Sequence, residues 1–170
     1  MKKSMLTKKL FQIILFVSIF PLTIFGQNST IKSTSLNQFG ALELAKQVNI
    51  EAIKFGKNVS IAVLDASGTV VLLLKGDNVG PHNTEASRRK AFTALSTKTA
   101  SLELMKKADA STDSKNLNTI SELLLLGGGV PIWKDGELIG SLGVSGGGGG
   151  DNDHLIAVTA IQNLNFTINK

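Results

Sequence analysis

The sequence contains no cysteine, no tyrosine, one tryptophan and two histidines, His82 and His154. The absence of cysteine excludes thiol catalysis, disulfide bonds and every metal centre that needs thiolate ligands. Two histidines are too few for a centre built on three imidazoles. No basic patch interleaved with aromatic residues is present, so nothing indicates nucleic-acid binding. Without disulfides, the fold has to be held by its core or by oligomerisation.

The first 26 residues differ from the rest of the chain. Four lysines precede an almost uncharged apolar run over residues 10–25, which Pro21 interrupts and which ends at Gly26. A basic start, a short apolar core and a small residue predict a secretory signal peptide over 1–26. The alternative is a membrane anchor, which needs about 20 apolar residues. We therefore expect a periplasmic or extracellular protein without stable membrane insertion after cleavage.

The net charge depends strongly on that segment. The whole chain carries 18 basic and 13 acidic residues, a net charge of +5. Four of the basic residues lie within 1–26, which leaves 14 basic and 13 acidic residues in the rest. The basic balance of the whole chain therefore says little about an acidic partner.

Residues 27–35 are polar and are expected to form a flexible leader before one domain over 36–170. Apolar residues at steps of three and four predict a first helix over 36–56, with Ser35 as its cap. Asp-Ala-Ser-Gly at 65–68 predicts the turn of a first β-hairpin.

The second half of the domain repeats this hairpin pattern. One or two helices are predicted over 85–108, with Thr84 as the cap. Asp-Gly at 135–136 predicts the turn of a second hairpin, and a closing helix follows residue 150. The order α-β-β-α(α)-β-β-α predicts an α+β domain with an antiparallel sheet and helices packed on it.

Five consecutive glycines, 146–150, stand between the last strand and the closing helix. No βαβ unit and no Gly-Lys-Ser/Thr sequence accompanies them, which disfavours a nucleotide site. Asp151 and Asp153 would repel a phosphate and would bond the free helix N–H groups themselves. We interpret the run as a strand-to-helix turn, in which Gly146 and Gly147 can approach a ligand closely because they lack a Cβ.

Five segments carry a family resemblance: "AVLDASGTVV", "SRRKAFTA", "GGGVPI", "DGELIGSLGVSG" and "DNDH". In their order and spacing the chain resembles the GlcG/HbpS family of haem-binding, sometimes haem-degrading, proteins. This family is also known as domain of unknown function 336 and occurs as the C-terminal domain of PduO-type proteins. The resemblance covers about residues 36–166. Asp153 matches the family's usual Asp, whereas the glycine run replaces a mixed stretch such as Gly-Ala-Thr-Gly.

The resemblance implies a PAS- or profilin-like sheet of about five strands with flanking helices. It also implies homo-oligomers, from dimers to octamers, and haem as the cofactor. The expected export signal fits the secreted, haem-binding members.

His82 is the candidate haem-iron ligand, because its imidazole precedes a predicted helix whose N-terminus can receive a propionate. The alternative is a surface or capping histidine, and His154 is expected to be exposed. Lys90 matches the family's Lys-Ala-x-Thr-Ala motif. It is expected either to contact a propionate or carboxylate or to form an internal pair with Asp65 or Glu85.

Thr93 and Thr97 lie one helical turn apart and either line a pocket or bond to backbone carbonyls. Phe55 and Phe92 either stack on a porphyrin or pack in the core. No paired carboxylates or Ser-His-Asp arrangement supports catalysis. Three hypotheses follow: an exported haem-binding protein that sequesters or senses haem and degrades it slowly, a binding protein or enzyme for a small organic acid, and an oligomeric interaction or sensor-partner protein.

Overall fold

The structure is a computed structural model that describes residues 31–170. The predicted signal peptide, 1–26, and the first residues of the leader lie outside the described residues. The chain divides into two units, and Ser33–Lys170 is the unit considered below.

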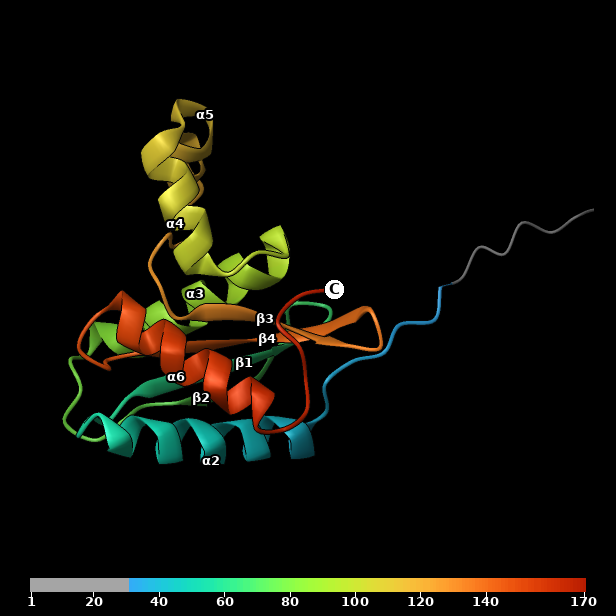
Figure 1. Cartoon of the computed structure of the whole chain (residues 1–170), viewed down its shortest axis with the longest axis vertical. Helices are drawn as coiled ribbons and strands as arrows, with labels where there is room; N and C mark the ends of the chain where they lie inside the picture. Colours follow the sequence, from blue (N-terminus) through green and yellow to red (C-terminus); the bar gives the residue numbers. More distant parts are fainter. Residues whose placement is uncertain (1–30) are drawn as a thin grey trace, which may run out of the picture. The chain divides into compact units, whose positions relative to one another are not determined.

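This unit has the element order that the sequence predicts (Figure 1). Both hairpins, the first helix and the closing helix are present, and the region between the hairpins forms two successive helices and two short turns. The elements are α2 (Gln38–Lys54), β1 (Ser60–Asp65), β2 (Val70–Leu74), α3 (His82–Thr97), α4 (Ser101–Ala110), α5 (Thr112–Lys115), η1 (Asn116–Thr119), β3 (Gly129–Lys134), β4 (Glu137–Ser145) and α6 (Gly150–Gln162).

The described strands form one antiparallel sheet in the order β2-β1-β4-β3. The α+β fold class is confirmed, but the expected number of about five strands is wrong, because the sheet has four. The segment after α6 contributes only a single bridge, between Trp133 and Thr167.

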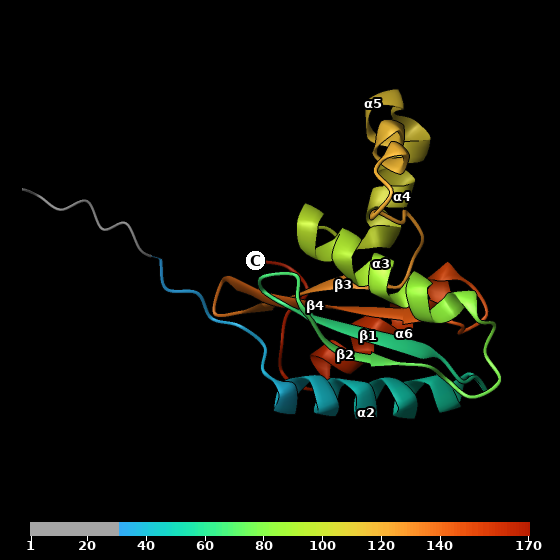
Figure 2. The same cartoon turned by 180° about the vertical axis from the view of Figure 1, so that it is seen from behind.

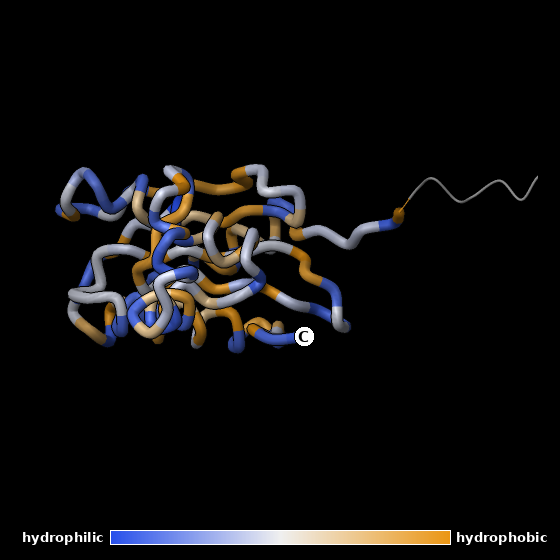
Figure 3. Tube along the Cα trace, turned by 90° about the horizontal axis from the view of Figure 1, so that it is seen from above, coloured by the Kyte–Doolittle hydropathy of each residue, from blue (hydrophilic) through white to orange (hydrophobic). Residues whose placement is uncertain are grey.

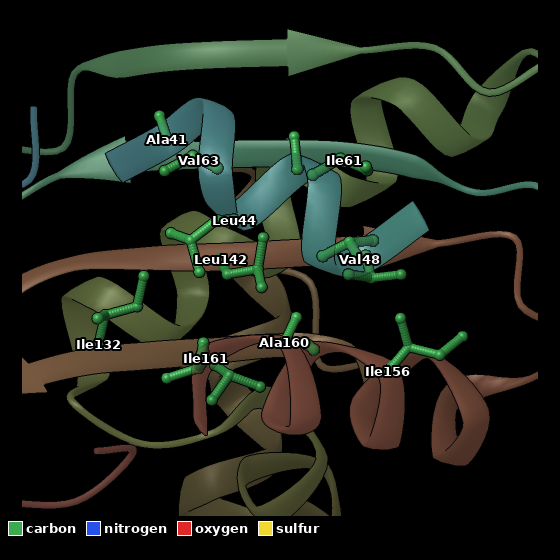
Figure 4. Close-up of a cluster of buried hydrophobic side chains, with 14 of the residues drawn as sticks. Ala41, Leu44, Val48, Ile61, Val63, Ile132, Leu142, Ile156, Ala160 and Ile161 are labelled. Atoms are coloured by element: carbon green, nitrogen blue, oxygen red, sulfur yellow. The ribbon is translucent and has the colours of Figure 1, made fainter. Parts of the chain in front are cut away.

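One face of the sheet packs against α2 and α6 (Figure 4). The side chains in this layer are aliphatic and almost fully buried, and they come from both helices and from β1, β3 and β4: Leu44, Val48, Ile61, Val63, Ile132, Leu142, Ile156, Ala160 and Ile161. Burying an aliphatic side chain of this size stabilises the fold by about 1.5–3 kcal/mol. This layer is therefore the main core, and Figure 3 shows hydrophobic trace in the interior with hydrophilic trace at many of the loops.

The other face of the sheet is covered by α3 (Figure 2). The two layers approach closely because small residues meet at the contact. A Cβ added to Gly143 of β4 would overlap the carbonyl oxygen of Ser87 in α3. Ala62, Ala91 and Leu95 complete this smaller core. The Lys-Ala-x-Thr-Ala motif thus presents its small residues to the sheet.

Two predicted helix caps are corrected. Asn37 rather than Ser35 caps α2, since Asn37 Oδ1 accepts the N–H of Gly40 at 2.9 Å. The Ser35 hydroxyl oxygen instead accepts the N–H of Ala66 at 3.1 Å. Helix α3 begins at His82, so Thr84 lies inside its first turn and does not cap it.

Helix α4 continues from α3 and leads away from the sheet toward α5 (Figure 1). It is joined to β3 through Ser101, whose Oγ accepts the N–H of Gly129 at 2.8 Å and donates to the carbonyl oxygen of Leu126 at 2.6 Å. Leu104 and Leu123 bury a small cluster beneath it. Within residues 31–170, no helix combines the length and apolarity needed to cross a membrane.

Candidate ligand-binding site

A cavity of about 310 Å³ lies where α3 begins. We call it the α3 groove. Its lining comes from the segment after α2, the loop before α3, the first turn of α3 and the glycine run: Gly56, Lys57, Asn58, Asp77, Asn78, Val79, Gly80, Asn83 and Gly146. Strand register brings these loops together, because Ser60 of β1 pairs with Ser145 of β4 directly before them. The volume lies within the roughly 300–1,000 Å³ usual for small-molecule sites.

A second cavity, of about 330 Å³, lies next to the α3 groove and is lined by residues of α2, β1 and β2. The two cavities share Lys57, Asn58 and Asp77. Ile53 and Leu74 give the second cavity apolar walls.

Lys57 is the cation that lies along the glycine run. A Cβ added to Gly148 would lie 3.3 Å from Lys57 Cε, so the lysine stem crosses the outer side of the run. Lys57 is exposed and lines both cavities. An ammonium in this position can meet an anionic group of a ligand.

His82 is the first residue of α3 and is exposed at the margin of the groove. A Cβ added to Gly80 would lie 2.9 Å from His82 Cε1. The imidazole therefore sits directly beside a residue that lines the groove. Neutral imidazole nitrogens are suitable iron ligands, and the dipole of α3 favours a negative charge near its N-terminus.

Lys90 is buried and forms an ion pair with Asp153 of α6. Lys90 Nζ lies 2.7 Å from Asp153 Oδ2, and the two side chains are 4% and 5% exposed. The ammonium also donates to the carbonyl oxygen of Val144 at 3.1 Å and to Ser145 Oγ at 3.3 Å. The predicted internal pair therefore exists, but its partner is Asp153 and not Asp65 or Glu85. These three bonds use all three donors of the ammonium.

Gly146 and Gly147 occupy different positions relative to the α3 groove. Gly146 lines the cavity and has a φ of 114°, which a residue with a Cβ rarely adopts. Gly147 is buried behind it and donates its N–H to Asp153 Oδ1 at 2.7 Å. Asp153 was expected to bond a free N–H of the closing helix, and the structure corrects this: it bonds the preceding loop, and Gly149 is the N-cap of α6.

The remaining sequence candidates lie away from the α3 groove. Thr93 is fully buried: its Oγ1 donates to the carbonyl oxygen of Arg89 and accepts the N–H of Leu124, both at 2.8 Å. Thr97 donates to the carbonyl oxygen of Thr93 at 2.7 Å. Phe92 packs against the α3 face of the core. Both threonine hydroxyls therefore bond to backbone carbonyl oxygens, which was one of the two alternatives predicted for them.

His154 is half-buried and not exposed as expected. Burial lowers its pKa below the ordinary 6.5, while Glu103 and Asp151 act in the opposite direction and Lys106 adds to the lowering. Its Nδ1 is buried without a hydrogen-bond partner among the described residues. Within residues 31–170, no group of three His, Cys, Asp or Glu side chains is arranged to hold a metal ion.

Sequence reasoning missed Asn83 and Ser145. Ser145 Oγ donates to Asn83 Oδ1 at 2.8 Å, and Asn83 Nδ2 donates to the carbonyl oxygen of Gly80 at 3.1 Å. Both residues have ordinary turn and strand-end character in the sequence. Their connection depends on the strand register, which no local pattern encodes.

These features define a small α+β domain with a groove at one end of a four-stranded antiparallel sheet. The chain belongs to the HbpS-like family, described as haem degrading protein HbpS-like, whose model matches residues 36–162. The predicted resemblance is confirmed.

Relatives include the corrinoid adenosyltransferase PduO of Salmonella typhimurium, which is 32% identical over 127 residues. That match covers 74% of this chain but 35% of PduO, so the chain spans about a third of the relative's length.

Two solved structures share the fold. A double mutant of Streptomyces reticuli HbpS is 33% identical, with a TM-score of 0.74 over 81% of this chain and 92% of the other. A structure of a PduOC:heme complex is 29% identical, with a TM-score of 0.73 over 81% of this chain and 100% of the other.

Proposed function

We propose that this chain binds haem in the α3 groove and uses His82 as the iron ligand. The observation that carries this proposal is the imidazole beside Gly80, at the margin of a cavity whose lining includes Lys57 and Val79. Membership of the haem degrading protein HbpS-like family and the likeness to a haem complex of PduOC support it.

The residues of the groove and of the second cavity fit the chemistry of this cofactor. Val79 in the groove and Ile53 and Leu74 in the second cavity offer apolar contact to a porphyrin face or edge. Lys57 and the first turn of α3 offer positive charge to the propionates. Gly146 has no side chain to fill the groove. A Cβ there would lie 3.3 Å from Asn58 O and from Val79 Cγ1, so a larger residue would take up space between these lining residues.

In this proposal the protein binds, orients and shields, while haem, when bound, supplies the redox chemistry of its iron. The role is sequestration or sensing of haem, with slow degradation as a secondary activity. Lys90 does not contact haem in this proposal, because its ammonium uses all three donors in hydrogen bonds to other residues of the protein.

A haem titration of residues 27–170, followed at the Soret band, tests the proposal. We expect a saturable band whose position changes in His82→Ala, because the iron loses its imidazole. His154→Gln is the matched control and should leave the band unchanged. A saturable band unaffected by His82→Ala moves the ligand elsewhere. Absence of saturation rejects haem, and a thermal-shift screen of small organic acids, which stabilise by mass action, then tests the organic-acid hypothesis.

We propose in addition that the protein is exported to the periplasm or the extracellular space. The basic and apolar pattern of residues 1–26 supports this. Expression of the full chain followed by cell fractionation and N-terminal sequencing tests it. A mature protein that begins near residue 27 in the exported fraction is expected, and an uncleaved chain retained with the cytoplasm would reject the proposal.

We propose that the domain forms homo-oligomers through the outer side of α2. Phe39 and Ile53 are 72% and 71% exposed, and Leu42 lies one turn from Phe39 on the same side. Apolar residues at steps of three and four suit packing against the same helix of a second copy, because a two-fold interface is self-complementary. Sedimentation velocity should show a smaller species for Phe39→Glu/Ile53→Glu. An unchanged sedimentation coefficient would reject this interface.

A further inference from the structure

We infer that the buried Lys90–Asp153 pair positions the glycine run as a wall of the α3 groove, and that Asp153 acts as the loop's fastening point. The inference rests on the proposed function for its binding readout. Its structural part concerns only this chain's own contacts.

The glycine run has no side chains that could hold it in one conformation. Gly146, Gly148 and Gly149 have φ values of 114°, 95° and 143°, and glycine pays a larger conformational entropy cost on ordering than other residues. The run has no side chains with which to bond its surroundings. Its fixed conformation therefore has to come from bonds to its backbone.

Two side chains supply those bonds. Asp153 Oδ1 accepts the N–H of Gly147 at 2.7 Å, and Asn152 Nδ2 donates to the carbonyl oxygen of Gly147 at 3.1 Å. The Asp153 bond is the buried one and is charge-assisted, which makes it the stronger of the two. A Cβ on Gly147 would lie 2.8 Å from Asp153 Oδ1, so glycine is needed at this point.

Lys90 holds the carboxylate in place for this bond. It occupies Oδ2 at 2.7 Å and leaves Oδ1 directed to Gly147. Gly128 makes room for the pair, since a Cβ there would lie 2.8 Å from Asp153 Cβ and 3.2 Å from Lys90 Nζ. Each carboxylate oxygen thus has a separate partner.

The same network reaches other lining residues of the groove. Lys90 donates to Ser145 Oγ, Ser145 donates to Asn83 Oδ1, and Asn83 donates to the carbonyl oxygen of Gly80. Gly80 and Asn83 line the groove, and so does Gly146, which is next to Gly147. A single chain of hydrogen bonds, buried at Lys90 and partly buried at Asn83, therefore connects the glycine run to the start of α3. Lys90 and Asp153 are positioning residues in this account, because neither lines the cavity.

Two double variants separate the effect of the Asp153–Gly147 hydrogen bond from the effect of the Lys90–Asp153 ion pair. Lys90→Met/Asp153→Asn removes both charges but keeps an oxygen acceptor for the Gly147 N–H. Lys90→Met/Asp153→Leu removes both charges and the acceptor. Both should fold, since replacing a whole buried ion pair avoids the unpaired charge that a single substitution leaves.

The readouts are amide hydrogen exchange at Gly147 and haem affinity from the Soret titration. Both variants lose the Lys90 bond to Ser145, so we expect the Asn variant to keep slow exchange at Gly147 while binding haem about threefold more weakly than wild type. The Leu variant should lose the protection of Gly147 and bind haem about tenfold more weakly, the effect of one lost hydrogen bond and a less preorganised wall. Slow exchange and unchanged affinity in the Leu variant would overturn the inference.

Gly147→Ala provides a second route if the Leu variant does not fold. It keeps both charges and displaces the loop from Asp153 Oδ1, so it should weaken haem binding and also lower the melting temperature, because its Cβ overpacks a buried contact. Wild-type affinity in Gly147→Ala would contradict the inference. If wild-type protein fails to bind haem, the proposed function fails, whereas hydrogen exchange at Gly147 still tests whether Asp153 holds the glycine run in place.

Discussion

The carbonyl oxygen of Ser87 in α3 occupies the space that a Cβ on Gly143 of β4 would need. A Cβ at this position would overlap that oxygen and would come within 2.9 Å of the Ala91 nitrogen. The contact is between two backbones, so neither side can relieve it by changing a rotamer. The glycine in the "SLGVS" segment thus fixes how closely α3 approaches the sheet.

Gly143→Ala is therefore expected to lower the free energy of unfolding by about 1–3 kcal/mol, the usual cost of overpacking a core. Urea unfolding measures the effect. The matched control is Gly40→Ala in α2, where the Cβ meets only the side chains of Leu36 and Asn37 and helix propensity improves. Equal stability of Gly143→Ala and wild type would contradict this account of the layer spacing.

Thr93→Val should lower the stability of the fold without changing the affinity for haem. The substitution leaves the N–H of Leu124 without its acceptor, and an unsatisfied buried donor costs about 1–3 kcal/mol. Thr97→Val is the control. Within residues 31–170, the Thr97 hydroxyl only donates, to the carbonyl oxygens of Thr93 and Thr99, so its loss leaves no N–H group there without an acceptor. A large loss of haem affinity in Thr93→Val with stability retained would place Thr93 in the site after all.

Lys57→Ala should weaken haem binding by about fivefold, the effect of losing roughly 1 kcal/mol from an exposed charge contact. The melting temperature should not change, since Lys57 is exposed. Lys107→Ala on α4 is a lysine control outside both cavities. The Soret titration at low and moderate salt measures both variants, and the difference should shrink as salt rises. A difference independent of salt would argue against a charge contact.

The stability of the domain should fall as the pH drops below about 6.5, partly because of His154. Burial lowers the pKa of His154 in the folded state, so the unfolded chain binds the proton first. Stability from this group is complete above the unfolded pKa of about 6.5 and is lost as the pH falls toward the lowered folded value.

The measurement is the urea midpoint from pH 7.5 to 5.0 for wild type and His154→Gln. Glu103 and Lys106 of α4 and Asp151 of α6 are the charged groups that act on the imidazole. The variant should show a shallower decline, because it lacks the titrating group. Parallel curves would show that His154 does not contribute.

The sequence predicts most of the fold because its signals are local. The turns at Gly68 and Asp135 define both hairpins, and apolar periodicity defines α2 and α6. It also indicates both strands of each hairpin, which are the four strands of the sheet. The count of about five strands is what the family resemblance implies, and no residue pattern predicts a fifth strand. The sequence misplaces the first helix caps because Asn37 and Pro81 compete with Ser35 and Thr84 over two or three positions, the range in which such boundaries are least certain.

The candidate site is predicted less completely. His82, Gly146 and Gly147 are found by residue type, and Gly146 lines the groove, whereas His82 lies at its margin and Gly147 is buried behind Gly146. The partner of Lys90 is not found, because Asp153 lies 63 positions away and the pairing depends on how α6 packs over the sheet. Asn83 and Ser145 carry no local signal at all.

The outer backbone of β3 has no hydrogen-bond donor left to offer at three of its residues. Ser101 takes the N–H of Gly129, Pro131 has none, and Thr167 takes that of Trp133. A blunted edge of this kind resists strand addition. Of the two edges of the sheet, β2 alone remains suited to template another strand. Pairing of copies through that edge would stop at two, because a β2–β2 pair leaves only blunted edges outside, and continued growth into a fibril is blocked by the same three residues.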